Sequence, residues 1–150
     1  MRRGLVRAAK VLGLTLALSV VPAAVAPSAQ ARWTPRYDML RWINGARADR
    51  GLVHLHMGPR LLNLANRHSR QMAGQGRIYH STPLSATLRY VSWRVAGENV
   101  GVGGRMWKLY EAFMDSSPHR ANILEYRFRR VGVGVYVHDG FKWVTMIFVG

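Results

Sequence analysis

A stretch in the second half of the chain reads FMDSSPHRANIL (residues 113–124) and places a serine pair and a proline between two apolar segments. Before the break, aromatic and apolar residues recur at helical spacing over residues 105–116. Pro118 cannot continue a helix because it lacks the backbone donor, so a fresh turn is predicted through Leu124. The stretch therefore predicts a helix, a break, and a turn that carries His119.

Two further helices are predicted towards the N-terminus. Apolar residues recur at helix-like spacing over residues 37–46, and Gly51 suits a left-handed stop. Residues 52–55 then cross in extended form to Gly58. Pro59 can open the next helix, whose apolar face continues to Ala73 before Gly, Gln and Gly end it.

The strands are predicted in the remaining segments. Residues 96–100 lie at or beside a strand, and residues 131–136 and 141–149 form a hairpin around His138-Asp139-Gly140. Residues 84–94 carry no clear pattern. We interpret the glycines at 97, 132 and 134 as sites of strand bending. Helices followed by strands predict an α+β domain in which helices flank an antiparallel sheet.

The N-terminus has the pattern of a secretory signal. A basic start is followed by an apolar run over residues 11–26 and by Ala29-Gln30-Ala31, which predicts a signal peptide over residues 1–31 with cleavage after Ala31. Pro22 and Pro27 interrupt the run and disfavour a membrane anchor. We expect a short leader over residues 32–36, a single domain over residues 37–150, secretion to the outside or the cell envelope, and no membrane span after cleavage.

Charge and cysteine content limit the function classes. The sequence has no Cys, which excludes disulfides, thiolate metal sites and a cysteine nucleophile. Four of its 22 basic residues lie in the first ten positions, so the rest carries 18 basic against 7 acidic residues, a formal charge of +11. Such a field attracts anionic partners. Because the basic residues are scattered, we expect an anionic wall polymer or lipid rather than a specific nucleic acid.

Two histidines stand beside small hydroxyl residues where solvent can reach them. These are His80 and His119, and Glu98 lies between them in a Gly-flanked segment. Their spacing fits no compact metal motif, and a histidine near a helix end is more often a hydrogen-bond partner than a ligand. The residues alone leave a site and a structural role both open.

Several motifs, taken in order, resemble those of bacterial secreted domains of the CAP (SCP) superfamily. The resemblance spans residues 37–149 and rests on INGARADRGL (43–52), residues 61–72, His80-Ser81, GENV (97–100), residues 113–124 and VGVG (131–134). The resemblance implies a three-layer α-β-α sandwich with a central, mainly antiparallel sheet.

The resemblance also implies a binding cleft that gathers two histidines and acids from distant segments. Carried over, these are His80, Glu98 and His119, while Ser116 stands where a fourth, acidic group is found in the eukaryotic branch. Two imidazoles can bind a divalent metal such as zinc, so His80 and His119 are the predicted metal ligands. No other cofactor is expected.

Three functions remain open from the sequence. The first is a binding domain that holds an extracellular ligand in this cleft. The second is a metal-assisted hydrolase in which Glu98 is the candidate base. The third is a cationic binder of anionic polymer or lipid, in which the charge alone is sufficient.

Overall fold

The computed structural model describes residues 34–150. The predicted signal peptide over residues 1–31 and the first two leader residues lie outside the described residues. The helices are α1 (Pro35–Ala48), α2 (Pro59–Gln75), α3 (Leu84–Thr87), α4 (Met106–Asp115) and α5 (Ser117–Leu124). The strands are β1 (His56–Met57), β2 (Ala96–Gly103), β3 (Arg130–His138) and β4 (Phe141–Val149).

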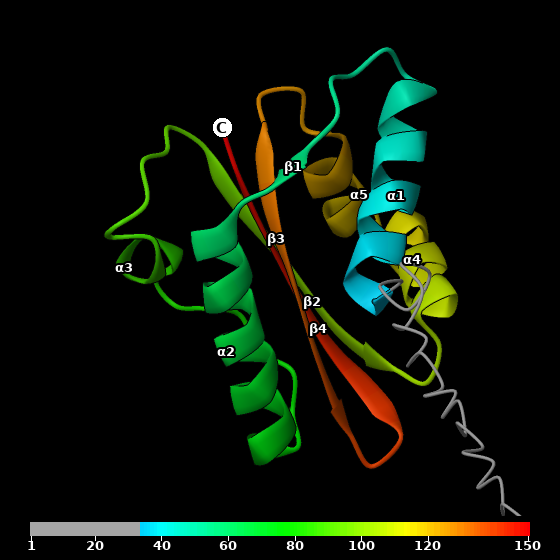
Figure 1. The fold of residues 1–150 in the computed structure, drawn as a ribbon, viewed down its shortest axis with the longest axis vertical. Helices are drawn as coiled ribbons and strands as arrows, with labels where there is room; N and C mark the ends of the chain where they lie inside the picture. Colours follow the sequence, from blue (N-terminus) through cyan, green and yellow to red (C-terminus); the bar gives the residue numbers. More distant parts are fainter. Residues whose placement is uncertain (1–33) are drawn as a thin grey trace, which may run out of the picture. The chain divides into compact units, whose positions relative to one another are not determined.

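The described residues form an α-β-α sandwich around one sheet. The strand order is β1-β3-β4-β2; β3 pairs antiparallel with β4, and so does β2, whereas the short β1 runs parallel to β3. Helices α2 and α3 lie on one side of the sheet, and α1, α4 and α5 lie on the other (Figure 1). The predicted fold class is confirmed, including the mainly antiparallel sheet.

The glycines of β3 let helix α2 lie directly on the sheet. A Cβ atom on Gly132 would lie 2.2 Å from the carbonyl carbon of Leu61, and one on Gly134 would lie 2.2 Å from that of Ala65. No side chain fits in that space. The interpretation of these two glycines as bends was therefore wrong: they are positions of close backbone contact. Gly97 of β2 is likewise crowded, by the side chain of Asn122.

The opposite face of the sheet holds the larger core. Alternate residues of β3 and β4, including Val131, Val133 and Phe148, join side chains of α1, α4 and α5 such as Ile43 and Phe113. This two-residue period sends the valines of the VGVG motif into the core while its glycines face α2. The burial of these apolar side chains is the main stabilising contribution to the fold.

Several local predictions were incomplete. Helix α1 begins at Pro35, before the predicted start at residue 37, because proline is compatible with the first helical turn. The untyped segment contains α3, and the predicted turn after Pro118 is the full helix α5. The extended crossing continues into β1, which hydrogen-bonds to β3. Strand β2 and the hairpin were predicted correctly.

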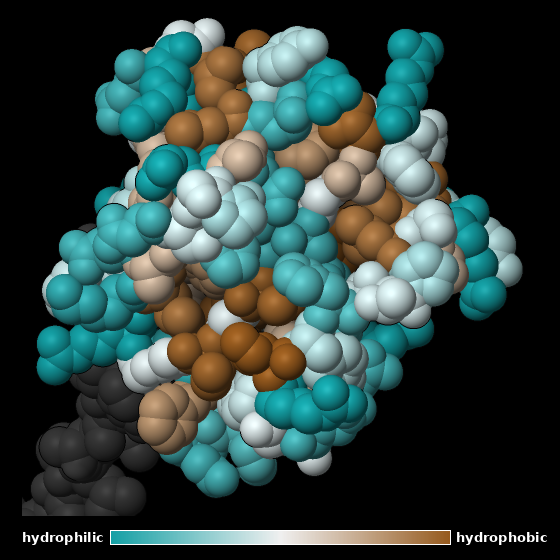
Figure 2. Space-filling model, turned by 180° about the vertical axis from the view of Figure 1, so that it is seen from behind, coloured by the Kyte–Doolittle hydropathy of each residue, from teal (hydrophilic) through white to brown (hydrophobic). Residues whose placement is uncertain are grey.

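Apolar side chains also reach the surface. Seen from behind, apolar groups appear among hydrophilic ones at the top, right of centre and, most compactly, in the lower centre of the view (Figure 2). Among residues 34–150 no helix has the length and apolar character needed to cross a membrane.

Candidate functional site

Three separate segments position the predicted site residues. Glu98 lies in β2, at the open edge of the sheet beyond β4. His80 and Ser81 lie in the loop that follows α2, and His119 lies in the first turn of α5. Strand β2 therefore lies next to one segment from each helical layer, namely the loop after α2 on one side and α5 on the other.

Glu98 is a buried carboxylate whose two oxygens accept three hydrogen bonds. Oε1 accepts bonds from the backbone N–H of Ser81 at 2.8 Å and from Nδ1 of His80 at 2.9 Å. Oε2 accepts a bond from the Ser81 hydroxyl at 2.7 Å. Because an ionised carboxylate only accepts, the His80 proton lies on Nδ1, and the lone pair of Nε2 is free.

The burial of this pair is strongly asymmetric. The side chain of Glu98 is 4% exposed, whereas that of His80 is 56% exposed. The buried carboxylate therefore fixes the ring, and the ring presents its free nitrogen to solvent. Such a carboxylate–imidazole pair orients a histidine for ligand binding.

Two asparagines attach α5 to β2 beside Glu98. The Asn99 side-chain amide donates to the His119 carbonyl oxygen at 3.0 Å. Asn122 donates to the Glu98 carbonyl oxygen at 3.2 Å and to the Asn99 side-chain oxygen at 2.8 Å. Both asparagines therefore satisfy backbone carbonyl groups, and these bonds bring the first turn of α5 to the carboxylate.

His119 is half-buried and lies edge-on to Phe113, with 5.2 Å between the ring centroids. Burial lowers the pKa of His119, and Coulombic repulsion from His80, in the protonated form of that ring, lowers it further. The neutral imidazole is therefore favoured, which is the form that accepts a hydrogen bond or binds a metal.

The remaining predicted member, Ser116, is the N-terminal cap position of α5, and its side chain makes no capping hydrogen bond. Within residues 34–150 no group of three or more His, Cys, Asp or Glu side chains could hold a metal ion. The two oxygens of Glu98 are already engaged with Ser81 and His80. Glu98 is therefore not arranged as a third metal ligand beside both imidazoles.

A second set of candidate residues was not predicted. Two adjoining cavities of about 450 and 490 Å³ run beside α2, and both are lined by His68, Gln71, Ser81 and Thr87. The first also reaches His80. His68 also has a structural contact, since its Nε2 lies 2.8 Å from the Tyr79 carbonyl oxygen.

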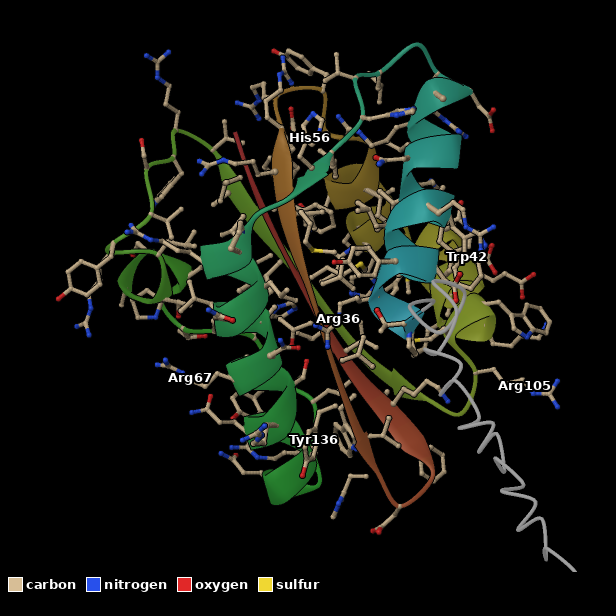
Figure 3. The ribbon with its side chains drawn as sticks, viewed as in Figure 1. Arg36, Trp42, His56, Arg67, Arg105 and Tyr136 are labelled. Atoms are coloured by element: carbon tan, nitrogen blue, oxygen red, sulfur yellow. The ribbon has the colours of Figure 1, made fainter. Side chains whose placement is uncertain are left out.

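Arginines surround these cavities. Arg77 lines the first, and Arg67 and Arg89 line the second. Arg67 extends from α2 on the side away from the sheet (Figure 3). One sequence signal could have found this surface: residues 50–97 contain seven arginines and no acidic residue.

Comparisons with known proteins agree with the motifs. The sequence profile of the family described as "CAP: Cysteine-rich secretory protein family" matches residues 40–148. The uncharacterized protein YkwD of Bacillus subtilis is 32% identical over 114 residues, which cover 71% of this chain and 44% of YkwD. The chain thus spans less than half the length of this relative.

Solved structures show the same fold. An extracellular protein containing an SCP domain from Bacillus anthracis has a TM-score of 0.69 and 25% identity, over 77% of this chain and 40% of that one. An outer surface protein from Borrelia burgdorferi has a TM-score of 0.71 and 17% identity, over 77% and 91% of the two chains. The motif order, the sandwich and the matching profile together show that the chain belongs to the CAP family, as a member without cysteine.

Proposed function

We propose that this protein is a secreted CAP-domain protein that binds a polar ligand at the cell envelope or outside the cell, through the imidazoles of His80 and His119. The observation that carries the proposal is the Glu98 arrangement, in which a 4% exposed carboxylate holds a 56% exposed imidazole. A buried carboxylate needs hydrogen-bond partners, and Glu98 accepts three such bonds. The arrangement leaves the Nε2 atom of His80 available to a ligand.

Secretion is supported by the N-terminal sequence pattern and by the relatives. The B. anthracis protein is described as extracellular and the B. burgdorferi protein as an outer surface protein. A ligand for this chain is then expected among components of the envelope or the surroundings.

The geometry favours binding over hydrolysis. A general base must reach the proton that it abstracts. The Glu98 carboxylate is instead turned inwards to the Ser81 backbone and hydroxyl. Within residues 34–150, Ser116 makes no side-chain hydrogen bond to a histidine that would activate its hydroxyl. The Glu98 carboxylate thus serves to orient the His80 imidazole.

We retain His80 and His119 as the proposed ligands of a divalent metal such as zinc. In that case Glu98 orients His80 from behind, as carboxylates commonly do for metal-binding histidines. A bound ion would supply a Lewis-acid centre for an anionic or carbonyl group of the ligand. With two protein ligands, affinity is expected to be weak.

The proposal is tested by probing an array of envelope polysaccharides and lipids with the wild type and with His80→Ala/His119→Ala. We expect at least one component to be retained by the wild type and lost by the double variant. His54→Ala/His138→Ala is the matched control, because both residues are exposed and lie outside the site. Equal retention by all three proteins would contradict the proposal.

The metal is tested separately by calorimetric titration with zinc and with magnesium. We expect a zinc isotherm for the wild type, its loss in His119→Ala, and a weakened isotherm in Glu98→Gln, which no longer fixes His80. Identical isotherms for the wild type and His119→Ala would remove the metal from the proposal and leave the ligand site standing.

A further inference from the structure

We infer that the groove beside α2, made of the two adjoining cavities, binds an extended acidic sugar or sugar-alcohol chain, that is, a hydroxyl-bearing polymer carrying carboxylate or phosphodiester groups. The inference goes beyond the proposed function because it requires neither His119 nor a metal. It rests on the positive charge around the groove, on the contacts that its arginines make, and on the polar residues along its length.

The charge on this side of the molecule is mainly positive, and the Glu98 carboxylate, which contacts Ser81 and His80, is buried behind them. Helix α2, the loop after it and α3 all lie within residues 50–97, which have seven arginines and no Asp or Glu. A groove lined by one sign of charge concentrates the field and attracts anions more strongly than an open surface. The acid-free stretch therefore places a positive potential over the cavities.

The guanidinium groups at the groove are arranged to donate hydrogen bonds to an anion. Arg77 lies over the Tyr79 ring at 5.0 Å from its centroid, and Arg89 lies over Tyr90 at 4.9 Å. Arg67 has no hydrogen bond or ion pair recorded within residues 34–150. Stacking restricts a guanidinium yet leaves its N–H edge free, so less conformational entropy is lost when it binds an oxyanion.

The groove also offers neutral polar groups along its length. Gln71, Ser81 and Thr87 line both cavities, which makes them one continuous surface. Amide and hydroxyl groups can donate to and accept from sugar hydroxyls. Cations at both ends with neutral polar groups between them match a chain that carries anions at intervals.

A sugar chain fits these observations better than a nucleic acid or a membrane does. Proteins that bind single-stranded nucleic acid stack bases on free aromatic faces. Here one face of Tyr79 and one face of Tyr90 are each covered by an arginine, Arg77 and Arg89, which leaves less aromatic surface for bases. An anionic membrane surface is attracted by the same charge, but it is flat, whereas these arginines line concave cavities whose shared residues are all polar.

The inference is tested by measuring binding of hexagalacturonate and of poly(glycerol phosphate) at about 0.15 M salt, where long-range attraction is screened. The test variant is Arg67→Gln/Arg77→Gln/Arg89→Gln. The charge-matched control is Arg41→Gln/Arg105→Gln/Lys108→Gln on α1 and at the start of α4, where Arg105 extends away from the sheet (Figure 3). The neutral sugar maltohexaose and single-stranded oligothymidylate complete the panel.

We expect the wild type to bind at least one acidic chain and the groove variant to bind it about tenfold or more weakly, because charge-assisted contacts are lost. The control variant should change affinity by less than about threefold, as expected for screened exposed charges. Which acidic chain binds distinguishes carboxylate from phosphodiester recognition.

Three results would overturn the inference: equal losses in both triple variants, equal binding of maltohexaose, or tighter binding of oligothymidylate. The variant His119→Ala distinguishes binding in the groove from binding at the histidine site of the proposed function. Acidic-chain binding that persists in His119→Ala supports an independent groove, whereas its loss there would contradict that independence.

Discussion

The two faces of the sheet differ in whether their exposed cations lie near acids. On the side of α1, α4 and α5, exposed cations lie within reach of acids: Arg41 contacts Asp38 at 2.7 Å and Lys108 contacts Glu111 at 3.0 Å. On the side of α2, the arginines stack on tyrosines, donate to carbonyl groups or, in the case of Arg67, make no hydrogen bond or ion pair within residues 34–150. Cations paired within a protein are less available to a ligand, so the difference assigns binding to the α2 side.

The two faces also differ in how they are held to the sheet. The α1/α4/α5 side interdigitates large apolar side chains, whereas α2 touches the strand backbone through glycines. One buried cation belongs to the first side: Arg47 is 0% exposed and donates to the carbonyl oxygens of Val53, Ile123, Glu125 and Phe128. It joins α1 to the segment around the end of α5 without any carboxylate contact.

The largest expected effect comes from removing that cation. Arg47→Met leaves buried carbonyl oxygens without donors and should lower the free energy of unfolding by about 3–5 kcal/mol. Urea denaturation measures the change. Arg50→Met is the matched control, because Arg50 is exposed and should shift stability by about 0.5 kcal/mol or less. Similar losses in both variants would show that Arg47 is not the link described.

A large effect is also expected where α2 meets the strand. Gly134→Ala places a methyl group 2.2 Å from the Ala65 carbonyl carbon and should destabilise by about 3 kcal/mol, since neither backbone can move freely. Gly74 lies in α2, and a Cβ atom there would have nothing within 4 Å. Gly74→Ala should therefore raise the free energy of unfolding by roughly 0.5–1 kcal/mol. Thermal unfolding of both variants and the wild type measures these changes. A Gly134→Ala variant as stable as the wild type would contradict the close contact.

A smaller effect is expected at the junction of α5 and β2. Asn122→Ala loses bonds to the Glu98 carbonyl oxygen and to the Asn99 side chain, and should cost about 2 kcal/mol. It should also weaken ligand retention, because His119 is no longer held beside Glu98. Asn63→Ala on the exposed side of α2 is the control. Unchanged stability in Asn122→Ala would contradict the role given to this residue.

The pH dependence follows from the lowered pKa of His119. The unfolded chain takes up the proton near the ordinary value of 6.5, and the folded protein takes it up only at lower pH. Stability is therefore full above 6.5 and falls as the pH drops through the folded pKa. Melting temperatures between neutral and mildly acidic pH should fall less steeply in His119→Gln. Parallel slopes for both proteins would contradict this.

The smallest effect is expected in the groove. The triple variant at Arg67, Arg77 and Arg89 should unfold within about 1 kcal/mol of the wild type, because exposed side chains contribute little to stability. Circular dichroism during urea unfolding is sufficient to measure it. A large loss of stability would assign these arginines to the fold instead of to binding.

The sequence predicted those features that depend on local pattern. Helical spacing and the alternating VGVG motif specify elements regardless of what they contact, so the helices and the hairpin could be assigned. The role of Gly132 and Gly134 could not, because the atoms that crowd them lie in α2, far away in the chain. Strand β1 is two residues long and exists only through its pairing with β3.

The candidate site was predictable in part for the same reason. His80, Glu98 and His119 could be named from ordered motifs, and His80 and Glu98 do form a hydrogen bond. The engagement of Ser81 with both carboxylate oxygens depends on a loop conformation that no spacing rule encodes. The groove depends on which arginines lack acidic neighbours in space, and only the acid-free composition of residues 50–97 points to it.

The most direct test of the contrast between the two faces is a map of amide chemical shifts. The ¹⁵N-labelled protein is titrated with whichever acidic chain it binds, and the shifts are assigned by residue. We predict that the largest changes fall in α2 and in the segment between α2 and the end of α3, next to the shared cavity residues. Changes centred on α1 and α4 would contradict the assignment of binding to the α2 side.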